Sequence, residues 1–108
     1  MQRTKIIERV THLGEVVRRA EQACREDAAV PDQLKRSVSV LSAHTNQARQ
    51  LLLNERNDDR VVHCIDDLEA LSDEARHLCT QAGVTSRKLA DAITQAHSEL
   101  SSLKRQLH

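Results

Sequence analysis

Apolar and small side chains recur along almost the whole chain in alternating steps of four and three residues. This spacing places them on one side of an α-helix and is typical of helices that pack against one another through a seven-residue repeat. The repeat predicts four helices, near residues 3–29, 31–55, 58–82 and 85–107. The predicted core positions are Ile6, Val10, Leu13, Val17, Ala20, Cys24, Leu34, Val38, Leu41, Thr45, Ala48, Leu52, Ile65, Leu68, Ser72, Ala75, Cys79, Ala82, Leu89, Ile93, Ala96, Leu100, Leu103 and Leu107.

Three features of the sequence separate these helices. Residues 54–60 form an uninterrupted polar run in which Asn and Asp can cap the following helix. Gly83 suits the C-terminal end of a helix, and Thr85 suits the N-terminal cap of the next one. A proline inside a helix costs about 3 kcal/mol, so Pro31 is expected to mark a connection rather than a kink.

Four helices of similar length joined by short connections favour an up-down-up-down path. We therefore predict an all-α antiparallel four-helix bundle with a heptad core. On such a path the core positions of the four helices fall into shared layers, and one layer contains Val17, Leu41, Ser72 and Ala96. Each layer mixes large and small side chains, which pack together well. The whole chain, residues 1–108, is expected to form one domain.

A second architecture fits the same pattern, because the repeat continues in phase through Pro31 and Gly83. Two helices of about fifty residues each would form a long hairpin that dimerises into a four-helix bundle. Further apolar residues flank the core positions, and so wide an apolar stripe suits four helices of a single chain. The closed bundle is therefore the preferred prediction, with a homodimer as the alternative. The flanking residues are Ile7, Val16, Ala23, Leu51, Cys64, Leu71 and Leu78.

The composition narrows the classes of partner. Sixteen basic and sixteen acidic residues cancel, and aromatic residues are absent. The chain therefore has neither the positive field nor the stacking surfaces that nucleic-acid binding uses. No segment has the length of a membrane span and the start does not read as a signal peptide, so we expect a cytoplasmic protein that binds neither nucleic acid nor membrane. The three cysteines lack CxxC spacing, which argues against a disulfide framework and a zinc site.

Residues 42–48, which include His44, resemble the phospho-accepting helix of histidine phosphotransfer domains. Those domains are also four-helix bundles with an exposed histidine, and the resemblance implies that a ring nitrogen of His44 accepts a phosphoryl group. They carry Lys three residues after the histidine and Gly four residues after it, whereas this chain has Gln47 and Ala48. The cation that stabilises the phosphate is therefore missing, and an ordinary surface histidine is the competing interpretation.

Other patterns suggest metal binding but lack the context for it. Glu74 and His77 have the Glu-x-x-His spacing of di-iron four-helix bundles, but the predicted core phase turns both side chains outward. His63 lies about 21 Å from His77 along a straight helix, so the two cannot share one ion. Cys24 and Cys79 fall near the same end of the bundle, where two thiols could bind a soft metal or form a disulfide. Their helices are diagonal in an up-down bundle, so we interpret both cysteines as core residues.

The sequence contains no phosphate-binding loop, HExxH or GxSxG motif, so we predict no catalytic residues, no metal and no cofactor. The remaining hypothesis is a non-enzymatic helical protein–protein interaction module, an adaptor or chaperone-like subunit whose partner is another protein. Val40 and Leu53 are apolar residues off the core positions, and apolar residues on helical faces commonly mediate such association. A phosphotransfer domain centred on His44 is the second hypothesis, and a metal or cofactor carrier is the third.

Overall fold

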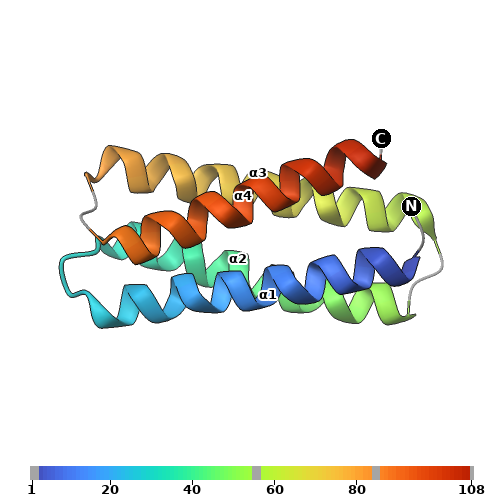
Figure 1. The fold of residues 1–108 in the computed structure, drawn as a ribbon, viewed down its shortest axis with the longest axis horizontal. Helices are drawn as coiled ribbons and strands as arrows, with labels where there is room; N and C mark the ends of the chain where they lie inside the picture. The colour runs from blue at the N-terminus through green and yellow to red at the C-terminus, as the bar shows by residue number, and fades with distance from the viewer. Residues whose placement is uncertain (1–2, 55–56, 84–85, 108) are drawn as a thin grey trace.

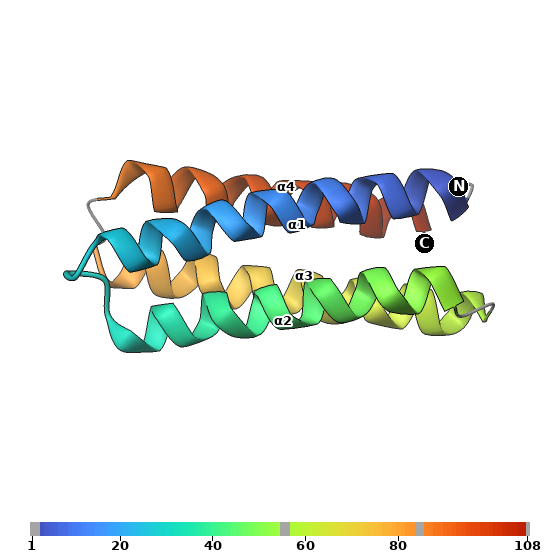
Figure 2. The same ribbon diagram turned by 90° about the horizontal axis from the view of Figure 1, so that it is seen from below.

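The computed structural model describes residues 3–54, 57–83 and 86–107, and four helices account for nearly all of them. They are α1 (Arg3–Glu26), α2 (Asp32–Asn54), α3 (Asp58–Gln81) and α4 (Arg87–Leu107). The helices alternate in direction, and each packs against the one before and the one after, with α4 closing the ring on α1 (Figure 1). Figure 2 shows α1 and α4 as one layer and α2 and α3 as the other. The predicted up-down-up-down four-helix bundle is therefore confirmed.

The chain reverses direction between α1 and α2, at the connection that contains Pro31. The Asp27 carboxylate accepts a hydrogen bond from the Ala29 amide at 2.9 Å, and the Asp27 carbonyl accepts one from the Val30 amide at 3.2 Å. These local bonds compete with the helical ones, so α1 ends at Glu26 and not near residue 29 as predicted. The connection predicted at Pro31 is confirmed, and a continuous helix through this position is not what the structure shows.

The other two connections are also built on local capping bonds. Asn57 caps α3, because its side chain accepts a hydrogen bond from the Asp59 amide at 2.9 Å. Gly83 has a φ of 61°, the left-handed conformation that glycine adopts most readily, so its predicted place at the end of α3 is confirmed. The predicted cap Thr85 lies outside the described residues. Ser86, which the sequence analysis did not single out, accepts a hydrogen bond from the Leu89 amide at 3.2 Å.

The core follows the predicted heptad positions closely. All of them are buried except Ala82, which is exposed beyond the end of α3, and Leu107, which is partly buried. Two of the seven flanking residues are buried as well, namely Val16 and Ala23. Three further core residues were not predicted: Val30, Val61 and Ala92. Val30 is buried because it lies in the short α1–α2 connection, where it covers the end of the core.

Two hydroxyl side chains lie inside this otherwise apolar core. Thr45 is 1% exposed and donates a hydrogen bond to the Leu41 carbonyl at 2.7 Å. Ser72 is fully buried and donates to the Glu69 carbonyl, also at 2.7 Å. Each hydroxyl is satisfied by its own helix, so small polar residues fit core positions without an uncompensated polar group.

Candidate interaction surface between α2 and α3

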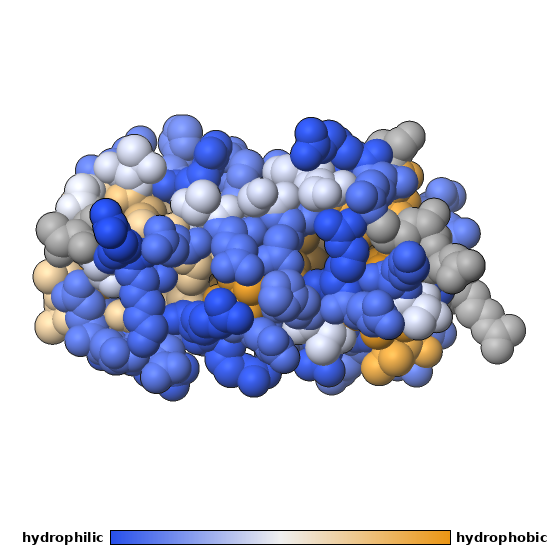
Figure 3. Space-filling view, in the orientation of Figure 1, coloured by the Kyte–Doolittle hydropathy of each residue, from blue (hydrophilic) through white to orange (hydrophobic). Residues whose placement is uncertain are grey.

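Polar side chains bridge three of the four outer boundaries between neighbouring helices. Between α1 and α4, His12 lies 3.3 Å from Glu99. Between α3 and α4, His97 lies 3.4 Å from Asp73. Between α1 and α2, Ser42 donates a hydrogen bond to Glu21. Figure 3 views the molecule over α1 and α4, and that face is covered mostly by hydrophilic side chains.

The boundary between α2 and α3 differs from the other three. No hydrogen bond or ion pair joins residues 32–54 to residues 58–81. Two hollows lie along this boundary, with volumes of about 620 and 430 Å³. We call them together the α2/α3 groove. The larger hollow is lined by His44, Gln47, Leu51, Asp59, Arg60, His63, Cys64, Asp67 and Leu68, and the smaller by Gln33, Arg36, Ser37, Val40, Leu71, Glu74 and Leu78. Hollows of about 470 Å³ at one end of α1, α3 and α4 and about 200 Å³ between α3 and α4 lie elsewhere on the described surface.

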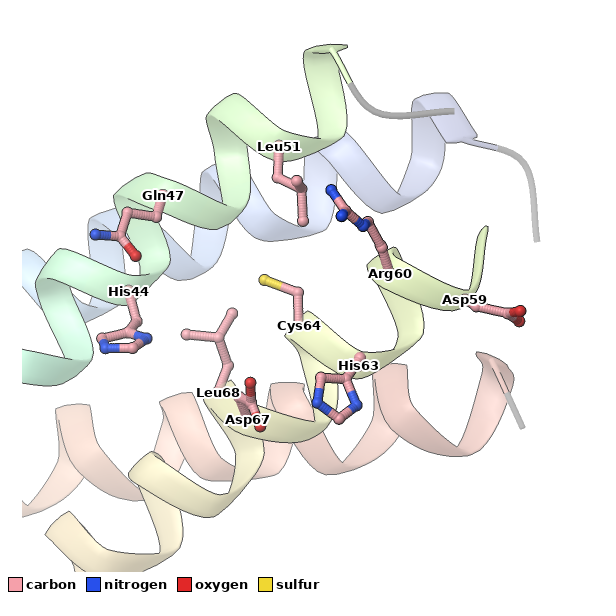
Figure 4. A pocket seen from close by; sticks show the side chains of 9 residues that line it. All are labelled: His44, Gln47, Leu51, Asp59, Arg60, His63, Cys64, Asp67 and Leu68. Carbon is pink, nitrogen blue, oxygen red and sulfur yellow. The ribbon is translucent and has the colours of Figure 1, made fainter. Parts of the chain in front are cut away.

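The larger hollow has an apolar floor and polar walls. Figure 4 shows Leu51 of α2 and Cys64 of α3 projecting into the space between the two helices, whereas the carboxylate of Asp59 points away from it. Leu68, which is fully buried, closes the bottom. His44 lies on the α2 wall and is exposed. Such a hollow can receive an apolar group and bind polar groups at its edge.

The smaller hollow continues the groove toward the other end of the bundle. Leu71 and Leu78 are partly buried and pack against the core from α3. Val40 on α2 is 42% exposed, and it is one of two large apolar residues whose side chains are mainly exposed in the described part of the chain. The other is Leu53, which is 68% exposed and does not line the groove. Val40 and Leu53, which were predicted to lie off the core positions, are thus both exposed, and only Val40 lines one of the two hollows.

His44 occupies the position that the phosphotransfer resemblance requires, but its surroundings differ from that family. Its side chain is exposed on α2, about midway along the helix. Gln47 lies one turn later in the same hollow, where the family has Lys, and Ala48 is buried at 1% exposure. The structure brings no lysine into the lining of this hollow. A phosphoryl group on His44 would therefore lack the lysine that the resemblance implies, and the cation in the lining of this hollow is Arg60 of α3.

The candidate metal ligands do not come together. Glu74 and His77 are both exposed, as the helical phase predicts, and Glu74 lines the groove whereas His77 does not. His63 is exposed on the wall of the larger hollow. Within the part of the chain that the structure describes, no three His, Cys, Asp or Glu side chains are placed to hold a metal ion.

The three cysteines are free thiols. Cys24 and Cys79 are buried in α1 and α3, and no Cα atoms of these two diagonal helices lie within 8 Å of each other in their described ranges. That separation is too large for a disulfide without movement of the backbone. Cys64 is partly buried and lines the groove, and burial followed by the nearby Asp67 carboxylate raises the pKa of its thiol. None of the three is an activated nucleophile, because burial raises the pKa of each.

Comparison with models of protein families, with curated proteins and with solved structures finds no match to this chain. Among the helices of the described ranges, none is long and apolar enough to cross a membrane.

Proposed function

We propose that this protein is a non-enzymatic protein–protein interaction module, an adaptor or chaperone-like subunit that receives the apolar surface of a partner protein in the α2/α3 groove. One observation carries the proposal. The boundary between α2 and α3 holds partly exposed apolar side chains beside two hollows, and no hydrogen bond or ion pair among the described residues covers them. Each of the other three boundaries has such cover.

Binding of a partner in the groove is favourable because the groove leaves apolar surface accessible to water. Long polar side chains shield the edges of a core when they bridge two helices, as His97 and Asp73 do between α3 and α4. Leu51, Leu71 and Val40 have no such cover across the groove. Removing apolar surface from water contributes about 25 cal/mol per Å², so a partner that fills the two hollows gains binding energy directly from them. A straight groove between two antiparallel helices suits a helical surface of the partner.

The cellular location is part of the same proposal. Cys24, Cys64 and Cys79 are all free thiols in the structure, and free thiols suit a reducing compartment. We therefore place the interaction module in the cytoplasm.

Phosphotransfer through His44 is the second candidate, and the exposure of its ring on a four-helix bundle favours it. Incubation with acetyl phosphate separates the two candidates, since only a phosphotransfer domain becomes labelled on His44. The third candidate, a carrier, would have to hold an organic ligand in the larger hollow, because the described residues form no metal cluster. Metal analysis and mass spectrometry of the purified protein test that candidate.

Site-specific photocrosslinking in the producing cell tests the proposal. A photoreactive residue replaces Gln47 on the α2 wall of the groove, and a matched control replaces Gln95, an exposed glutamine on α4. The expected result is a crosslinked product of defined mass from position 47 and none from position 95. Equal products from both positions, or none from position 47, would reject the groove as the interaction surface.

A second pair of variants distinguishes binding in the groove from nonspecific hydrophobic association. Val40→Glu places a charge in the groove, whereas Leu53→Glu places one on the exposed apolar residue outside it. Both side chains are exposed, so neither change unfolds the bundle. We expect Val40→Glu to remove the product from position 47 and Leu53→Glu to leave it in place.

A further inference from the structure

The two helices that form the groove carry opposite net charge, although the chain as a whole is neutral. Helix α2 contains Lys35, Arg36 and Arg49 against a single acid, Asp32, which gives a net charge of +2. Helix α3 contains seven carboxylates and two arginines, which gives a net charge of −5. Concentrating acids on one helix is in itself unfavourable, because like charges repel.

Most of the α3 carboxylates that face away from the groove are already paired. Asp66 and Glu69 lie 4.0 and 3.6 Å from Lys104 of α4. Asp73 lies 3.4 Å from His97 of α4. The acids of α3 that face α4 therefore have basic side chains of α4 close to them.

Four polar residues that line the groove have no ion-pair partner among the described residues. Asp67 and Glu74 on the α3 wall form no ion pair with any described residue, and neither do Arg36 and His44 on the α2 wall. The opposite charges nevertheless lie at matching levels along the bundle. Arg36 and Glu74 line the smaller hollow, and His44 and Asp67 line the larger one. The α2 wall thus places Arg36 and His44 beside Glu74 and Asp67 of the α3 wall, and Arg60 is the cation on the α3 wall.

We propose that the occupant of the α2/α3 groove is a second copy of this chain, related by a two-fold axis parallel to the bundle. This inference rests on the proposed function, because it names the partner of the same groove. A self-complementary surface is what a two-fold interface requires, since each patch meets its own counterpart. Here the α2 wall of each copy lies on the α3 wall of the other, with Arg36 of one copy beside Glu74 of the second copy.

Charge also selects the direction of the two-fold axis. An axis across the helices would lay the acidic helix α3 on α3 of the second copy, so that carboxylates such as Asp67 and Glu74 would lie against carboxylates of the same helix. An axis along the bundle lays α2 on α3 of the second copy in an antiparallel sense, so that unlike charges meet. The same arrangement brings Val40 of each copy over the hollow that Leu71 of the other copy lines.

The face is large enough for a stable dimer. The bundle measures 42 × 21 × 18 Å, so one long face presents a projected area of roughly 750–900 Å². Stable protein interfaces bury about 800 Å² on each partner. The two hollows on this face can accommodate side chains of the second copy.

Sedimentation velocity of the purified full chain over a concentration series tests the inference by charge reversal. We expect the natural sequence to form a dimer of twice its 12.2 kDa mass. Arg36→Glu alone and Glu74→Arg alone each place like charges in contact twice per dimer, so each should weaken dimerisation by a factor of roughly ten or more. The double variant should recover the dimer, because the unlike pairs are restored with their signs exchanged. An equimolar mixture of the two single variants should recover it as well.

Matched controls reverse charges outside the groove. Arg105→Glu and Glu8→Arg change exposed residues of α4 and α1 and should leave the dissociation constant unchanged. A monomer at every concentration overturns the inference, and so does a dimer that is indifferent to Arg36→Glu and Glu74→Arg. In either case the proposed function stands if position 47 still crosslinks to a different protein. The absence of any product from position 47 would overturn both.

Discussion

The Cys64 thiol has its pKa raised by burial and then by the carboxylate of Asp67, which lies one turn further along α3 and lines the same hollow. The thiolate is the reactive form of cysteine, so the raised pKa slows alkylation at any pH below it. Asp67→Asn removes the negative charge and lets the pKa of Cys64 fall toward its usual range. We predict faster alkylation of Cys64 by iodoacetamide at pH 8, measured by mass spectrometry of the Cys64 peptide under dilute, monomeric conditions.

The other two cysteines serve as internal controls for this measurement. Cys24 and Cys79 are 4% and 8% exposed, so their modification requires the bundle to open. Their alkylation rates should be lower than that of Cys64 and should not respond to Asp67→Asn. A rate increase shared by all three cysteines would mean that the variant had loosened the fold.

Gly14 lies in the middle of α1, opposite Thr45 of α2. A Cβ atom added there would meet Cγ2 of Thr45 at 3.9 Å and Cδ of Arg49 at 4.0 Å, which is ordinary van der Waals contact. Glycine costs about 0.5–1 kcal/mol relative to alanine in a helix interior. We predict that Gly14→Ala raises the free energy of unfolding by about this amount in urea denaturation.

Substitution of the second glycine, Gly83, should lower the free energy of unfolding, whereas that of Gly14 raises it. A Cβ atom at Gly83 meets nothing within 4 Å, but the backbone has a φ of 61°. Because left-handed backbone costs a non-glycine residue about 1–2 kcal/mol, Gly83→Ala should destabilise the bundle by a similar amount. Equal effects of the two substitutions would contradict the helix end that the structure assigns to Gly83.

Charges in the central layers should be far more damaging than changes at the exposed helix faces. Leu41 and Ile93 are both 1% exposed, so Leu41→Asp or Ile93→Asp would bury an unpaired carboxylate and unfold or severely destabilise the protein. Glu74→Ala and His77→Ala alter exposed side chains and should leave the unfolding of the monomer almost unchanged. Thermal unfolding followed by circular dichroism compares them. If the exposed pair proved the more damaging, the helical phase would be wrong.

The fold could be predicted from the sequence because the seven-residue repeat alone determines which side of each helix is buried. The layer of Val17, Leu41, Ser72 and Ala96 is buried throughout, and the chain reverses at Pro31 as the cost of an interior proline requires. The end of α1 was misplaced by three residues, since the Asp27 side chain competes for the backbone only in the conformation that the connection adopts.

The candidate interaction surface was only partly predictable. The flanking apolar residues Leu51 and Leu71 and the acidity of residues 58–81 are visible in the sequence. A boundary between two helices is covered only where polar side chains reach across it. His97 reaches Asp73 across the α3/α4 boundary, whereas Arg36 forms no ion pair with Glu74 across the α2/α3 boundary. That difference depends on where the side chains lie in the folded bundle, which the pattern of apolar and polar residues along the sequence does not determine.

The functional proposals require that α1 and α4 of the same chain cover the inner side of α2 and α3, so that the outer groove stays free. An intrachain spin-label distance between cysteines placed at Lys5 and Leu53, in a chain whose native cysteines are replaced by alanine, tests this most directly. Labelled chains are diluted with unlabelled protein so that only distances within one chain are recorded. Because neighbouring helices lie roughly 8–10 Å apart, we predict a distance of about 15–25 Å with the labels included. A helix running straight through Pro31 would separate the two positions by about 70 Å, and any distance beyond about 50 Å would contradict the closed bundle.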